Sequence, residues 1–77
     1  MNIFVVDQSS KKLLGIIDFV PREDDIIILK ESEWKYIECR VNCRVYTPHE
    51  HSIVIFVTIC EPNYFKKLSE IDWKKVR

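Results

Sequence analysis

The sequence predicts a small, mainly β domain: a five-stranded antiparallel meander curled into a barrel, with one C-terminal α-helix. The chain has 77 residues, which is enough for one domain. Short runs of β-branched and aromatic residues alternate with polar or proline-containing breaks. The longest run alternates strictly between apolar and other residues, which is typical of a strand with one buried face. Together these observations favour strands joined by short hairpins.

The N-terminal half is predicted to form a hairpin followed by a short strand. The run Ile3-Phe4-Val5-Val6 is followed by turn-forming residues from Asp7 to Lys11, and apolar residues resume from Leu13 to Val20. Pro21 cannot donate a hydrogen bond to a ladder, so it ends the second strand or lies at an edge. The apolar run Ile26 to Leu29 has the length of a third strand.

The fourth strand carries the strongest periodic signal. Alternate positions from Ile37 to Val45 are apolar, and none of the side chains between them is aliphatic. The last strand runs from Ile53 to Ile59 after a loop. Pairing Tyr46 with Ser52 would bring the two apolar faces together, with Cys43 opposite Ile55, and a one-residue slip would separate them.

The C-terminal residues are predicted to form one helix that packs on the sheet. Pro62-Asn63 suits helix entry, and Phe65, Leu68 and Ile71 follow helical spacing, with a break at Ser69 as an alternative. Trp73 is expected to pack on the core. The complete expectation is a single domain, residues 1–77, with strands at about 2–7, 12–20, 26–30, 34–47 and 52–60 and a helix at about 63–76.

Five strands around a small core favour a closed or curled sheet, because open edges invite aggregation. A small SH3-like or OB-like barrel is therefore the expected architecture. An open antiparallel sheet with the helix packed on one face is the alternative.

One stretch carries a recognisable pattern. A strand is followed by a D-x-x-[ST]-K-x-L-L-G hairpin, here from Asp7 through Ser10 and Lys11 to Gly15, and then by the turn Pro21 to Asp25. An aromatic residue, Trp34, opens the next long strand. The pattern covers about a third of the chain and resembles small uncharacterised SH3-like β-barrel proteins of low-GC bacteria and their phages. Asp24 stands where that pattern commonly has glycine. The resemblance implies a barrel and a bacterial or phage source, but no functional residue.

Charge and cysteine content limit the functional classes. The 12 basic and 12 acidic side chains cancel, which removes the usual electrostatic basis for binding nucleic acid. Residues 1–33 nevertheless have a net charge of −3 and residues 34–77 a net charge of +3.

Three cysteines without a CxxC pair predict reduced thiols. No apolar run reaches the roughly 20 residues of a membrane span, and the N-terminus lacks signal-peptide features, so a cytoplasmic protein without membrane contact is expected.

The chemistry-bearing residues are poorly spaced for catalysis or metal binding. Cys39 and Cys43 would lie about 13 Å apart along a strand, which is too far to share a zinc ion. The segment His49-Glu50-His51 could supply a base, but Cys43 is expected on the buried face, where its thiol would be inert. With one glycine, the chain has no glycine-rich phosphate loop. No enzyme activity, cofactor or metal is expected.

A non-catalytic protein-binding module is therefore the expected function, in the form of a phage or mobile-element regulator or inhibitor of a host protein. A small barrel that binds single-stranded nucleic acid is the alternative, and a homo-oligomer that uses the same face for self-contact is a third. The expected binding face is the even-numbered side of the last two strands, and the acidic turn Glu23 to Asp25 is the next candidate. The residues predicted to bind are Tyr36, Arg40, Arg44, Tyr46 and Phe56.

Overall fold

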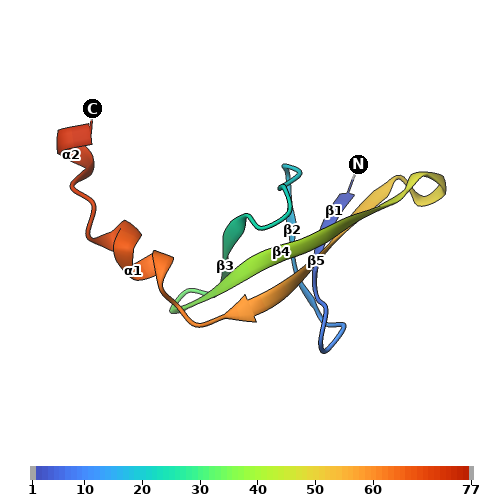
Figure 1. Cartoon of the computed structure of the whole chain (residues 1–77), viewed down its shortest axis with the longest axis horizontal. Coiled ribbons are helices and arrows are strands. Elements are labelled where there is room, and N and C mark those ends of the chain that lie inside the picture. Colours follow the sequence, from blue (N-terminus) through green and yellow to red (C-terminus); the bar gives the residue numbers. More distant parts are fainter. Residues whose placement is uncertain (1, 77) are drawn as a thin grey trace.

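The computed structural model describes residues 2–76 and confirms a mainly β fold (Figure 1). A short 3-10 helix, η1, lies at the tip of the last hairpin. Two short α-helices follow the strands. The elements are β1 (Asn2–Asp7), β2 (Leu13–Ile17), β3 (Ile26–Ser32), β4 (Lys35–Thr47), η1 (Pro48–Glu50), β5 (Ser52–Cys60), α1 (Tyr64–Ser69) and α2 (Trp73–Val76).

The five strands form one sheet in the order β2-β1-β5-β4-β3. The expectation of a purely antiparallel sheet is wrong, because β1 and β5 pair in parallel. The reason is topological. In a five-stranded up-and-down meander the first and last strands run the same way, so curling the sheet until they meet makes that contact parallel. β2 and β3 then become the two edges, and they approach each other near Gly15 and Leu29 without ladder pairing. The sheet is therefore a nearly closed barrel.

The core lies on the inner side of this curled sheet. Alternate residues of β1 and β5 point inward, and Val5 and Ile55 are fully buried opposite each other. The buried apolar residues are Ile3, Val5, Ile27, Cys39, Val41, Ile53, Ile55 and Val57, and Leu14, Ile17, Leu29 and Ile37 pack against them. Burial raises the pKa of the Cys39 thiol to about 11, with further contributions from nearby acidic groups.

A β-bulge in β4 corrects the expected register of the last hairpin. Val41 pairs with Val57 as expected, but the next pair is Cys43 with Phe56, so Asn42 is an extra residue. Beyond the bulge the inward and outward positions of β4 exchange. Cys43 is therefore exposed on the outer side instead of buried opposite Ile55.

The turn at Asp24 adopts a backbone conformation that favours glycine. Asp24 has a φ of 68°, in the left-handed region that glycine adopts without strain. Asp tolerates this conformation better than most residues. Its backbone N–H donates to the carbonyl of Val41, and the N–H of Val41 donates to the carbonyl of Asp25. The acidic turn therefore lies along the edge of β4.

The prediction of one docked C-terminal helix is wrong. The segment forms two short helices, α1 and α2, separated at residues 70–72, and its described side chains are exposed. Trp73 is 57% exposed and is not packed on the core. Asp72 explains why a second helix, α2, begins at Trp73. Its side chain accepts a hydrogen bond from the backbone N–H of Lys74, as a helix N-cap does. In Figure 1 both helices project beyond the sheet.

Candidate interaction surface

The outer side of the sheet carries a second apolar surface opposite the core. Residues paired across neighbouring strands point to the same side, so the register shows which outer side chains are neighbours. Two rows of apolar residues cross β2, β1, β5 and β4. We call this surface the outer apolar face; its rows are Ile16, Phe4, Val54 and Val45, and Leu13, Val6, Phe56 and Cys43.

The outer apolar face is open to solvent in this chain. Ile16 is 63% exposed and Leu13 is 57% exposed. The members on the central strands, such as Phe4 and Phe56, are half-buried by their own neighbours. A continuous apolar surface across four strands is typical of an interaction site, whereas singly scattered apolar residues are ordinary.

A polar band bounds the outer apolar face on one side. The side-chain amide of Asn42 donates to Gln8 Oε1 and to Thr58 Oγ1, each at 2.7 Å. Arg40 lies beside Thr58 in the same outer row. These bonds link the turn after β1 to β5 and β4, so the bulge residue holds three parts of the sheet together.

The structure separates the five residues that the sequence placed on one face. Phe56 belongs to the outer apolar face. Tyr36 and Arg40 lie on the same outer side of the sheet, but in the part of β4 that precedes the bulge at Asn42. Arg44 and Tyr46 pair with the inward-facing Ile55 and Ile53, so they lie on the opposite side of the sheet. They are exposed there because the hairpin extends past the end of β3.

Several members of the outer apolar face lie outside the predicted set. Leu13, Ile16, Phe4 and Val6 belong to the first hairpin, where apolar residues occupy both faces of each strand. Apolar residues on both faces of a strand indicate that both faces can be covered, so this pattern could have predicted the outer apolar face. Cys43 and Val45 had no such signal, since only the bulge turns them outward.

Beyond the polar band, Glu38 anchors the C-terminal segment to the outer side of β4. Glu38 is buried, and its Oε1 accepts hydrogen bonds from the backbone N–H groups of Asn63 (3.0 Å) and Phe65 (2.6 Å). Asn63 makes no capping bond through its own side chain, so a residue from β4 caps α1 instead. The ring of Phe65 also stacks on Tyr36, with centroids 4.4 Å apart.

The Glu38 carboxylate stays ionised in this environment. Burial raises its pKa, but backbone N–H donors and the charge of Lys67 lower it. The donors belong to Phe65, Tyr64 and Asn63. The net result is a pKa below the ordinary value of 4.5. The anchor is therefore complete near neutral pH.

Several cavities lie at the same end of the molecule, and two of them border Tyr36. One of about 150 Å³ sits on the outer side between Trp34, Tyr36 and Phe65. A larger one of about 490 Å³ lies at the open end of the barrel, with Leu14, Ile37 and Ile59 among its lining residues. Ile59 faces inward by register, yet it is 46% exposed because this end is uncovered. The larger cavity is rimmed by charges of both signs, including Lys12 and Glu31.

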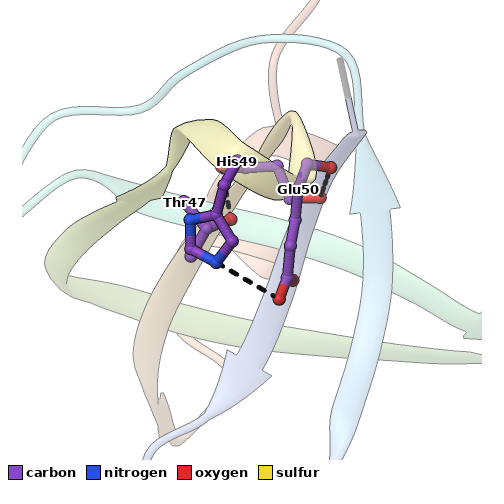
Figure 2. Close-up of polar contacts among 4 residues, drawn as sticks. Thr47, His49 and Glu50 are labelled. Carbon is purple, nitrogen blue, oxygen red and sulfur yellow. Dashed lines mark hydrogen bonds and ion pairs between the residues drawn. The ribbon is translucent and has the colours of Figure 1, made fainter.

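The hairpin tip holds the histidine and glutamate that suggested a base. His49 Nε2 lies 3.6 Å from Glu50 Oε1, and both side chains are exposed (Figure 2). The remaining tip contacts are structural: Thr47 Oγ1 donates to the carbonyl of Ser52, and Ser52 Oγ donates to the carbonyl of Glu50. Cys43 lies four residues before Thr47, about 13 Å along the strand. Cys43 is therefore too far from the His49–Glu50 pair to act as its nucleophile.

Among residues 2–76, no cluster of three or more histidine, cysteine or acidic side chains is placed to hold a metal ion. The same residues contain no helix with the length and apolar character needed to cross a membrane. Comparison with protein-family models, curated proteins and solved structures finds no match to this chain.

Proposed function

We propose that this chain is a non-catalytic protein-binding module whose outer apolar face docks a protein partner. The observation that carries the proposal is the pair of apolar rows across four strands. A sheet that is apolar on both sides needs a cover on each, and the inner side alone is covered by the chain's own core. The curled sheet holds the surface rigid, which lowers the entropic cost of binding.

The energy available at this surface is sufficient for specific binding. Fully burying a large aliphatic or aromatic side chain stabilises a complex by about 1.5–3 kcal/mol. Ile16 and Leu13 are mostly exposed, so they offer the largest gain, and the half-buried Phe56 adds a rigid aromatic surface between them and β4. Part of the free energy gained by burial offsets the rotational and translational freedom lost on binding. Since Ile16 and Leu13 have the most surface left to bury, they should contribute most of the affinity that remains.

Binding of single-stranded nucleic acid is less well supported. That alternative rested on basic and aromatic residues interleaved on one face. The bulge places Arg44 on the other side of the sheet from Arg40, and no basic side chain belongs to the eight members of the outer apolar face. Lys11, whose Nζ lies 5.9 Å from the ring centroid of Phe56, is at its border.

Regulation or inhibition of a host protein, by a chain of bacterial or phage origin, is the biological role we propose for such a module. Its support is the small size, the zero net charge and the resemblance of residues 7–29 to SH3-like barrels. The SH3-like or OB-like type, the cytoplasmic location and the absence of enzyme activity stay predictions.

The test is a pull-down from the source cells with the tagged full chain as bait. The parent is compared with Ile16→Glu, which puts a charge on the outer apolar face, and with Trp34→Glu, a control at a 90% exposed aromatic residue outside it. We expect proteins that the parent and Trp34→Glu retain and Ile16→Glu loses, unchanged by nuclease. Retention that nuclease abolishes and that falls steeply with salt would favour nucleic acid instead. Equal retention by all three baits contradicts the proposed surface.

A further inference from the structure

The C-terminal segment, residues 64–75, carries several exposed apolar side chains, and its contact with its own sheet is confined to its start. Tyr64, Phe65, Leu68, Ile71 and Trp73 are all substantially exposed, and only the first turn of α1 touches the sheet, through Tyr36 and Glu38. The radius of gyration is 13.8 Å, whereas a compact chain of this length should have about 11.5 Å. A short amphipathic helix in water gains most of its stability from packing, so this segment needs a partner.

The anchor prevents the segment from covering its own outer apolar face. Glu38 and Tyr36 hold the start of the segment on the outer side of β4. The polar band that contains Asn42 and Arg40 lies between this anchor and the outer apolar face. From there the segment runs outward past the end of the sheet, away from β1 and the tip of the β4–β5 hairpin (Figure 1). The chain thus carries two uncovered apolar surfaces that lie apart within one molecule.

The C-terminal segment has an excess of basic residues, whereas acidic residues outnumber basic ones around the outer apolar face. The segment contains Lys66, Lys67, Lys74 and Lys75 against two acidic residues. The outer apolar face is flanked by four acidic residues: Asp18, just after β2, and the acidic turn at residues 23–25 along the edge of β4. Two basic residues, Lys11 and Arg40, also lie at its border.

We propose that two copies of this chain form a reciprocal dimer in which the C-terminal segment of each packs on the outer apolar face of the other. This inference rests on the proposed function and names the occupant of the same surface. A second copy is favoured because each molecule supplies both halves of the contact, so one two-fold arrangement satisfies both surfaces twice. With zero net charge, the copies also lack long-range repulsion.

The test measures the mass of the purified full chain by size-exclusion chromatography with light scattering. We expect the parent to be a dimer. Ile16→Glu on the outer apolar face and Leu68→Glu on the segment should each raise the dimer dissociation constant about 100-fold, because each buries an unpaired charge. Trp34→Glu should remain dimeric. An equimolar mixture of Ile16→Glu and Leu68→Glu should form a heterodimer, since one intact face meets one intact segment.

Each alternative arrangement gives a different result. A parent that is monomeric up to millimolar concentration overturns the dimer, while the pull-down can still support a different protein partner. A dimeric Leu68→Glu indicates face-to-face packing, and a dimeric Ile16→Glu indicates segment-to-segment packing; either overturns the reciprocal arrangement. An equimolar mixture of Ile16→Glu and Leu68→Glu that stays monomeric also overturns the reciprocal arrangement. If a glutamate variant fails to fold by circular dichroism, Ile16→Ala and Leu68→Ala replace it, with a smaller loss of dimer expected.

Discussion

Single residues with unusual environments hold the parts of this molecule together. Glu38 and Ser52 are the buried polar residues of the described chain, and Glu38 is the one that carries a full charge. Its carboxylate replaces the missing side-chain cap of Asn63. Because a buried carboxylate needs several donors, the position of α1 is set by a residue more than twenty positions earlier in the sequence.

At this scale we predict that acid releases the C-terminal segment. The pKa of Glu38 is lowered in the folded state, so its contribution to stability is present above the ordinary value of 4.5 and is lost as pH falls through the folded pKa. Amide chemical shifts of Asn63 and Phe65, followed by NMR, should change with a midpoint below pH 4.5. In Glu38→Gln this transition should disappear. Shifts that titrate at or above the ordinary value, or that persist in Glu38→Gln, contradict the anchor.

Among the elements, β4 decides which residues form the outer surface. Its 13 residues contain the bulge at Asn42, which exchanges inward and outward positions halfway along the strand. Bulges increase local twist, and twist helps a small sheet to curl. In the part of β4 that precedes the bulge, Glu38 and Arg40 point outward. In the part that follows the bulge, Cys43 and Val45 point outward and belong to the outer apolar face.

At the element scale we predict that Asn42→Ala lowers the free energy of unfolding by about 1–2 kcal/mol, because it removes two hydrogen bonds worth about 0.5–1.5 kcal/mol each. Urea unfolding of the purified variants provides the measurement. Thr58→Val should have about half that effect. In the Thr58→Val background, Asn42→Ala should cost less than it does alone. Strict additivity, or no loss in Asn42→Ala, would show that these bonds do not stabilise the bulge.

At the scale of the whole molecule, the sheet forms a nearly closed barrel that is open at one end. Ile55 and Ile59 share the inward side of β5, but Ile55 is fully buried and Ile59 borders the cavity of about 490 Å³. The total stability of a 77-residue domain is roughly 4–12 kcal/mol. A single large core substitution can therefore remove much of it.

At the scale of the molecule we predict different costs for the same substitution at these two positions. Ile55→Ala should destabilise the fold by about 2–5 kcal/mol, because it leaves a cavity in the closed part of the core. Ile59→Ala should cost about 1 kcal/mol, since this side chain is only half removed from water. Thermal unfolding followed by circular dichroism compares the two. Equal losses would mean that the open end is covered in solution.

Sequence alone determined the local structure: the mainly β class, the positions of the five strands within a few residues, and the inward alternation from Ile37 to Val41. Alternation and turn chemistry are short-range properties, so they can be read from neighbouring residues. Phe56 was correctly placed on the outer side for the same reason.

Only the tertiary structure decided the features that depend on distant segments. The bulge adds one polar residue, Asn42, whose partners Gln8 and Thr58 lie elsewhere in the sequence, and it moves Arg44 and Tyr46 to the other side. The parallel pairing of β1 and β5 arises because the whole sheet curls until its first and last strands meet. Helical spacing predicted one amphipathic helix in the C-terminal segment, but an amphipathic pattern specifies an apolar side and not what covers it, and the helix breaks at residues 70–72.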